Sequence, residues 1–88
     1  MDLKAFIKDV LTPVLDYPEE LDVEVKTRDK QLDVFVRARQ EDRGRIVGRN
    51  GRMISSIRTL CRAAGEKQGM HVNLELVEDE VDEFKLEE

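Results

Sequence analysis

Two glycines three positions apart, Gly48 and Gly51, stand in the most arginine-rich part of the chain. Glycine readily adopts backbone conformations with positive φ, so Gly48-Arg-Asn-Gly51 predicts a tight turn that a ligand can approach closely. Arg45, Arg49 and Arg52 surround this turn, and a helical apolar pattern follows it. The turn would therefore stand at a helix N-terminus, where an anion is favoured. These residues predict a loop that holds a phosphate group.

The loop differs from a mononucleotide P-loop. Such a loop would place a lysine and then serine or threonine after its last glycine. Here Arg52 and Met53 occupy those positions.

Charge is divided unevenly along the chain. The 88 residues carry a net charge of −5, which by itself argues against a nucleic-acid partner. Between Arg37 and Arg62, however, eight arginines stand against two acids, giving +6, and the remainder carries −11. The position of the charge matters more than its total. Because all of the basic residues in this segment are arginines, they suit bidentate contact with phosphates.

Composition excludes several classes of function. A single cysteine, Cys61, allows neither an intrachain disulfide nor a cysteine metal cluster, and the only histidine, His71, falls in a different element. No nucleophile–base pair, paired carboxylates or metal-ligand set is apparent, so we expect no enzyme, no cofactor and no metal. No apolar run is long enough to span a bilayer, and the N-terminus does not read as a signal peptide. We expect a cytoplasmic protein with no membrane partner and no small-molecule substrate.

Periodicity predicts the elements that position the loop. Apolar residues at helical spacing predict a first helix that begins after a cap at Asp2 and ends near Leu11, before Pro13. Alternating patterns over 21–25 and 32–38 predict two strands joined by a turn at 27–30, which form a hairpin. Phe35 is out of phase with the inward-facing positions of its strand, so we expect it on the opposite sheet face, which His71 would share.

The glycine turn falls between two further helices. Asp42 is predicted to cap a very short helix, Arg43 to Val47. The next helix is predicted from Arg52 to Ala64, with Gly65 as its left-handed C-terminal cap. Its apolar stripe is predicted to contain these residues: Met53, Ile54, Ile57, Leu60, Cys61 and Ala64. Arg58 and Arg62 are assigned to the polar side, and an alternating pattern from Met70 predicts a last strand.

These elements assemble into one domain, 1–77, followed by an acidic tail, 78–88. We predict an α+β fold in two layers, with helices on one face of a three-stranded sheet. The hairpin makes the first two strands antiparallel, and the helical crossover brings the last strand in parallel to the second, so the sheet is mixed.

The stretch Gly44-Arg-Ile-Val-Gly-Arg-Asn-Gly-Arg-Met-Ile54, set between two helices, resembles the K-homology (KH) RNA-binding domains. The extra helix and strand precede the minimal β-α-α-β motif, which resembles the type II arrangement, α-β-β-α-α-β. More narrowly, the chain is similar to the small bacterial KhpA family. That similarity runs through the connector from Pro13 to Pro18, the approach Glu41-Asp42-Arg43-Gly44 and Ile57-Arg58-Thr59. It covers nearly everything from Leu3 to Val77.

The resemblance implies binding of single-stranded RNA, in which the loop clamps the backbone of about four nucleotides. It implies that Gly48 and Gly51 admit the sugar-phosphate and that Arg49 and Asn50 contact it. The apolar floor of the groove is assigned to Ile46, Val47 and Ile54, and the flanking phosphate ligands to Arg45 and Arg52; Arg58 and Arg62 would extend the track. With few aromatic residues there is no base-stacking platform, so sequence preference should be modest.

The family also implies an RNA chaperone or post-transcriptional regulator. It implies pairing, as a homodimer or with a larger KH protein of the KhpB/Jag type, in cell elongation and division. A second hypothesis therefore stays open, in which the chain is chiefly a dimerisation module. Phe35, His71 and the apolar positions of the tail (Val81, Phe84 and Leu86) motivate it. The acidic tail departs from the family and would weaken nonspecific binding or shield the groove.

Overall fold

The computed structural model describes residues 2–77, and the positions assigned to the tail lie outside them. Its helices and strands follow in the predicted order. They are α1 (Leu3–Leu11), β1 (Asp22–Arg28), β2 (Gln31–Arg37), α2 (Gln40–Val47), α3 (Arg52–Lys67) and β3 (His71–Leu76). Short 3-10 turns stand at Thr12–Val14, Pro18–Glu20 and Arg49–Gly51.

The sheet is mixed, as predicted. Its strand order is β1-β2-β3, with β1 antiparallel and β3 parallel to the central β2. Val23 pairs with Val36, and Val34 pairs with Leu74, so alternating apolar residues meet on one face. The two strands of the hairpin are longer than predicted at the turn, because Arg28 still pairs with Gln31. The turn is only Asp29-Lys30, and Asp29 adopts a positive φ of 50°.

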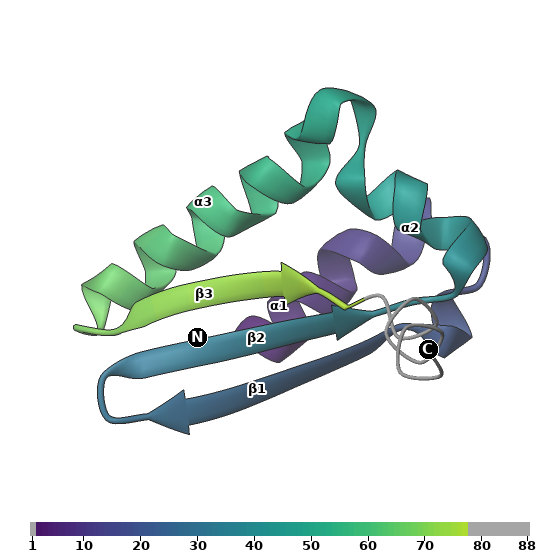
Figure 1. The fold of residues 1–88 in the computed structure, drawn as a ribbon. Helices are drawn as coiled ribbons and strands as arrows, with labels where there is room; N and C mark the ends of the chain where they lie inside the picture. Colours follow the sequence, from purple (N-terminus) through teal and green to yellow (C-terminus); the bar gives the residue numbers. More distant parts are fainter. Residues whose placement is uncertain (1, 78–88) are drawn as a thin grey trace, which may run out of the picture.

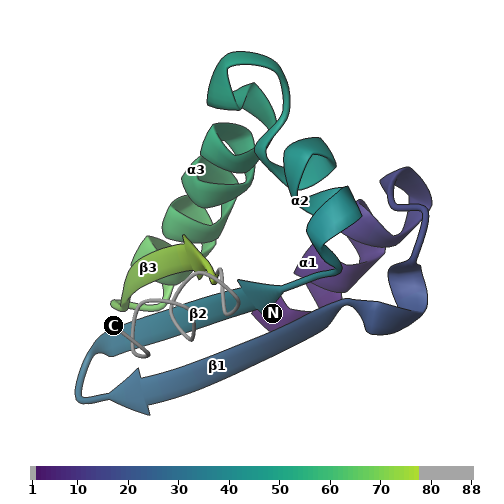
Figure 2. The ribbon, with the colours of Figure 1, turned by 45° about the vertical axis from the view of Figure 1, so that its right-hand side comes forward.

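All three α-helices gather on one side of the sheet (Figure 1), and the view in Figure 2 shows the same two layers. The core between the layers is apolar and draws on every helix and strand. Its most deeply buried members are Ile7, Leu11, Val23, Val34, Val36, Ile46 and Cys61. Phe35 is half-buried and lies on the other face, which it shares with His71, as predicted. The two-layer α+β fold with α-β-β-α-α-β order is confirmed.

The first helix begins and ends where the sequence predicts. The Asp2 carboxylate accepts a hydrogen bond from the backbone N–H of Ala5 (3.2 Å), which satisfies one of the free amides of the first turn. Leu3, Ile7 and Leu11 form its buried stripe. The chain then tightens into the turn that contains Pro13.

Asp42 does not cap α2, and this prediction is wrong. The helix begins three residues earlier than predicted, at Gln40, with Arg39 at its N-cap. Asp42 is completely buried, and its carboxylate points back to the connector between α1 and β1. It accepts hydrogen bonds from the backbone N–H groups of Asp16 (3.0 Å) and Tyr17 (2.8 Å). The Asp42 carboxylate was expected to accept from the N–H groups of its own helix, but it accepts from N–H groups about 25 residues away in the sequence.

The C-cap of α3 is Gln68, followed by the left-handed Gly69, and not Gly65, so the predicted end of this helix is also wrong. The helix continues to Lys67, and Gly65 is buried within it. A Cβ on Gly65 would collide with the Val72 side chain, so this glycine allows α3 to pack closely on β3. The left-handed position falls at Gly69 (φ 74°). The N–H of Met70 bonds to the carbonyl of Gly65 (2.8 Å), and that of Gly69 to the carbonyl of Glu66 (3.0 Å), which is the Schellman pattern.

Leu60 does not belong to the buried stripe of α3. It is 54% exposed, whereas Ile54, Ile57 and Cys61 are buried. The buried row of α3 consists of Ile54, Ile57, Cys61 and Gly65, and Leu60 lies outside it.

The Asp42 contacts generate a first prediction, on stability. Asp42→Asn keeps the shape of the side chain but puts an amide NH₂ where one backbone N–H now donates. We expect a loss of about 3 kcal/mol in the free energy of unfolding, since a partly buried hydrogen bond loses its charged acceptor and two donors then face each other. Urea unfolding measures this change. Asp9→Asn, at an exposed position of α1, is the control and should change stability by less than about 0.5 kcal/mol. Equal unfolding midpoints for wild type and Asp42→Asn would contradict the assigned role.

Candidate nucleic-acid interface

The glycine loop joins α2 to α3 at one end of the molecule (Figure 1). Three residues of the loop have positive φ: Gly48 (77°), Asn50 (57°) and Gly51 (73°). The N–H of Gly48 bonds to the carbonyl of Gly44 (2.8 Å), and the N–H of Gly51 to that of Gly48 (3.1 Å). The loop is therefore a hydrogen-bonded turn with a defined shape. Arg49 and Asn50 stand at its tip, and both are exposed.

The two glycines have different surroundings. A Cβ on Gly48 would lie 2.6 Å from the Cβ of Met53 and 2.9 Å from its backbone nitrogen, so this glycine permits the chain to fold back on the start of α3. Around Gly51 no atom lies within 4 Å of the corresponding position. Gly48 thus meets a packing requirement, whereas Gly51 leaves open surface beside the backbone.

The arginines before the loop are engaged with carboxylates. Arg37 pairs with Glu24 (3.2 Å) and Asp22 (3.8 Å) across the hairpin. Arg39 pairs with Glu20 (2.9 Å) and Glu41 (3.1 Å). The hydrogen bond to Glu20 and, to a smaller extent, the contact with Glu41 raise the pKa of Arg39. Its guanidinium also stacks on the Tyr17 ring, 4.1 Å from the centroid. The positive segment read from the sequence is therefore partly neutralised in the fold.

Arg45, predicted as a phosphate ligand, also forms ion pairs. Its Nη1 lies 3.1 Å from Asp16 Oδ2 and 3.6 Å from Asp42 Oδ1. About half of the side chain remains exposed. A phosphate at Arg45 would have to share this guanidinium with the connector.

Arg49 and Arg52 are placed as the loop hypothesis requires. Both side chains are exposed, one at the tip of the loop and one at the first residue of α3. Arg62 is also exposed, nearly three turns further along α3. Within residues 2–77, none of these three arginines forms an ion pair. Arg49 and Arg52 supply accessible positive charge next to the glycines, and Arg62 supplies it further along the helix.

The predicted apolar floor is divided between core and surface. Ile46 is 1% exposed and Ile54 is 7% exposed, so both pack into the core under the loop. Val47 is 36% exposed. Of the three residues, Val47 offers apolar surface to a ligand, and the two isoleucines hold α2 and α3 together beneath it.

Arg58 has a tertiary contact that the sequence reading missed. It was assigned to the polar side of α3, but it is half-buried, and its Nε donates a hydrogen bond to the Leu74 carbonyl of β3 (3.1 Å). The spacing of residues indicates this position: Arg58 lies four residues after Ile54 and three before Cys61, which places it at the border of the buried row.

Neither a reactive thiol nor a metal site is supported in the described part of the chain. Burial raises the pKa of the Cys61 thiol, which opposes thiolate formation. Residues 2–77 contain no group of three or more potential metal ligands. They also include no helix long and apolar enough to cross a membrane.

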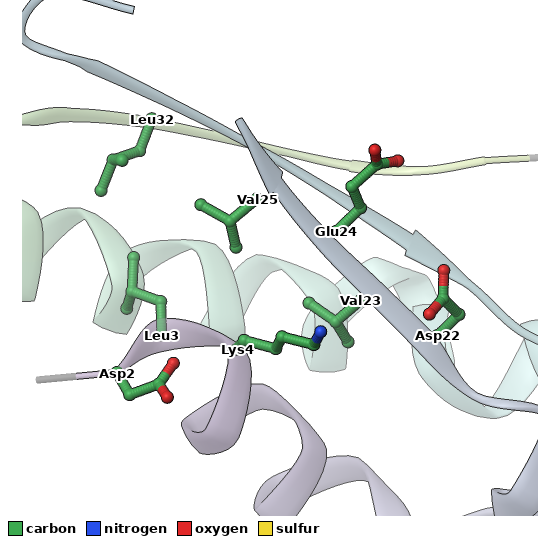
Figure 3. A pocket seen from close by; sticks show the side chains of 8 residues that line it. All are labelled: Asp2, Leu3, Lys4, Asp22, Val23, Glu24, Val25 and Leu32. Atoms are coloured by element: carbon green, nitrogen blue, oxygen red, sulfur yellow. The ribbon is translucent and has the colours of Figure 1, made fainter. Parts of the chain in front are cut away.

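One pocket lies away from the loop, between the start of α1 and β1 (Figure 3). Leu3 faces Val25, and the Lys4 side chain extends toward Val23. Its lining is Asp2, Leu3, Lys4, Asp22, Val23, Glu24, Val25 and Leu32. With three acids and one lysine around an apolar floor, this pocket does not suit a phosphate, and the loop remains the candidate interface.

A two-layer α-β-β-α-α-β domain with a Gly-x-x-Gly loop between its second and third helices is a type II KH domain. Comparison of sequences places it more narrowly. The profile of the KhpA/KhpB KH domain matches residues 4–76, and the chain belongs to this family.

Similar proteins include the RNA-binding protein KhpA of Lactiplantibacillus plantarum, which is 39% identical over 70 residues, covering 76% of this chain and 82% of that protein. The RNA-binding protein KhpA of Listeria monocytogenes is 32% identical over 76 residues, covering 86% of this chain and all of its own length. That of Bacillus subtilis is 28% identical over 74 residues, covering 84% of this chain and 91% of that protein.

The two glycines generate a second prediction. They have nearly the same φ but different ψ. Gly51 (ψ 14°) lies in the left-handed helical region, whereas Gly48 (ψ 175°) lies in a region that is essentially restricted to glycine. Only at position 48 would alanine also strike Met53. We expect Gly51→Ala to cost about 1 kcal/mol of unfolding free energy from the left-handed backbone. Gly48→Ala should cost about 3 kcal/mol or more, because overpacking against Met53 adds to the larger backbone strain. Chemical denaturation of both variants measures the difference, and equal losses would disprove the packing role of Gly48.

Proposed function

We propose that this protein binds single-stranded RNA non-enzymatically, with the Gly48–Gly51 loop as a clamp on the sugar-phosphate backbone. The observation that carries the proposal is the loop itself, a turn at the start of α3 with exposed Arg49 and Arg52 and open surface at Gly51. Relatives over most of the chain bear the name RNA-binding protein KhpA, which supports the same function here.

The clamp divides its tasks among few side chains. Arg49 and Arg52 bind phosphate oxygens, for which the planar guanidinium is well suited. Asn50 contacts the backbone from the tip of the loop, and Gly51 lets a nucleotide approach the main chain. Val47 supplies exposed apolar surface, with Ile46 and Ile54 supporting it from the core. Arg45 is a secondary phosphate ligand, because its guanidinium is already paired with Asp16 and Asp42.

Such a clamp suits an RNA chaperone or post-transcriptional regulator acting in the cytoplasm. Contact through arginines to phosphates makes affinity depend strongly on salt, because counterions are released from the nucleic acid. The backbone clamp by itself discriminates little between sequences. No metal or cofactor enters the proposal.

The clamp generates a third prediction. Replacing Arg49 and Asn50 together by aspartate places two carboxylates at the tip of the loop, and RNA affinity should fall at least about tenfold through lost and reversed phosphate contacts. The slope of log affinity against log salt should become shallower. Fluorescence anisotropy with a labelled single-stranded RNA measures both quantities.

A control variant separates the loop from total charge. Lys30→Asp with Gln40→Glu also lowers the net charge by three, at exposed positions in the hairpin turn and in the first turn of α2, where acids are tolerated. It should retain most of the wild-type affinity. If the loop variant binds RNA as tightly as wild type, the loop is not the clamp.

The exposed apolar residues favour a second candidate function, a dimerisation module. Leu60 is 54% exposed on α3. Phe35 lies on the sheet face opposite the helices, where Lys26 Nζ is 5.8 Å from its ring centroid. Either surface would suit a second copy or a larger KhpB/Jag-type KH protein. The mass of the loop variant in solution separates the two candidates. A loop variant that becomes monomeric yet keeps its RNA affinity would favour the dimerisation module.

The charge pattern generates a fourth prediction, on the division into a domain at 1–77 and a tail at 78–88. The tail carries seven acids and one lysine, a charge of −6 that competes with RNA for the loop arginines. The last described backbone bond, from the N–H of Val77 to the Val36 carbonyl, lies within the domain. A chain that ends at Val77 should therefore fold and bind RNA several-fold more tightly at low salt. The full chain with the tail acids changed to their amides should match the truncated one, and an unchanged affinity in both would rule out this role.

A further inference from the structure

Arg58 is fixed between α3 and β3 by its Nε, which donates to the Leu74 carbonyl (3.1 Å). A guanidinium has five N–H donors in a planar fork. The single bond to Leu74 leaves the four donors on Nη1 and Nη2 without a partner in residues 2–77. The side chain is thus oriented by the protein while its terminal edge remains available.

Among residues 2–77, the Leu74 carbonyl belongs to the outer edge of the sheet. β3 is the outer strand, and its pairing with β2 uses alternate residues: the N–H of His71 bonds to Lys30, and that of Val77 bonds to Val36. Leu74 belongs to the other set, whose N–H and carbonyl groups point away from β2. Arg58 therefore lies along the outer edge of β3.

This edge continues from the proposed clamp. α3 starts at the glycine loop and runs back along β3 (Figure 1). Arg58 is six residues after Arg52, about 9 Å further along the helix axis. A KH loop holds about four nucleotides, so a base next to the clamped backbone can reach this position.

We propose that Arg58 determines base specificity, by reading bases that present two adjacent hydrogen-bond acceptors. This inference rests on the proposed RNA binding. Cytosine offers N3 and O2 on its Watson–Crick edge, and guanine offers O6 and N7. The two Nη groups, held in plane by the Nε anchor, match such a pair.

The other two bases fit this fork poorly. Adenine places the N6 amino donor beside its N7 acceptor, and uracil places its N3–H donor between two carbonyls. Each would leave one guanidinium N–H facing a donor. The expected preference is therefore for cytosine and guanine over uracil and adenine, superimposed on a clamp that is otherwise indifferent to sequence.

Binding of octanucleotides to the full chain tests the inference. Oligocytidine is compared with oligouridine, and alternating G/U with alternating A/U, so that charge and length are equal within each pair. Wild type should prefer the first of each pair about tenfold, the range expected for one bidentate contact. Arg58→Lys keeps the charge and loses the planar fork. It should bind oligouridine like wild type and lose the preference.

Arg62→Lys is the matched control, since Arg62 is an exposed arginine one turn later on α3, and it should keep the preference. Thermal unfolding of both variants shows whether loss of the Leu74 bond alters the fold. A wild type without preference, or an Arg58→Lys variant that retains it, overturns the inference and leaves the clamp standing. A wild type that binds none of the octanucleotides instead refutes the proposed function on which the inference rests.

Discussion

The buried carboxylate of Asp42 is the interaction on which the candidate interface depends. It accepts hydrogen bonds from the backbone N–H groups of Asp16 and Tyr17, which lie in the connector between α1 and β1. A charge that is not exposed to water is costly unless it is fully hydrogen-bonded. Movement of α2 relative to the connector would break these bonds and is therefore disfavoured. They fix α2 against the connector, and α2 leads directly into the glycine loop. The position of the loop thus follows from a contact at the other end of its preceding helix.

Acids in and around the connector also form ion pairs with the arginines that precede the loop. Asp16 and Asp42 hold Arg45, while Glu20 and Glu41 hold Arg39, so arginines near the connector neutralise acids of the fold. Arg49 and Arg52 stand beyond this region and remain exposed. Although the net charge of the protein is −5, it presents a small positive surface at this loop. Such concentration favours phosphate contact at that loop over nonspecific association along the whole surface.

Periodicity and local capping rules were enough to predict the strand order, the cap at Asp2 and the placement of the loop between two helices. These features depend on residues close together in sequence. The errors at Asp42 and Gly65 concern contacts with a different element of the fold. Nothing near Asp42 reveals that Tyr17 needs its carboxylate, and nothing near Gly65 reveals that Val72 excludes a Cβ there. Leu60 satisfies helical spacing but is 54% exposed, because the surface that α3 buries is set by its tertiary neighbours and not by spacing alone.

Gly65 and Gly48 together set the geometry of the proposed binding surface. Gly65 brings the C-terminal half of α3 against β3, and Gly48 folds the loop onto Met53 at the other end of the helix. With both ends fixed, α3 and the edge of β3 hold a constant separation, which the Arg58 side chain spans to reach Leu74. A rigid separation of this kind lets a charged loop hold the backbone of a strand while a second, anchored donor meets its bases. Contact with phosphates positions a nucleic acid and contact with bases specifies it. In the proposed binding mode these two tasks fall on Arg52 and Arg58, six residues or about 1.7 turns apart on α3.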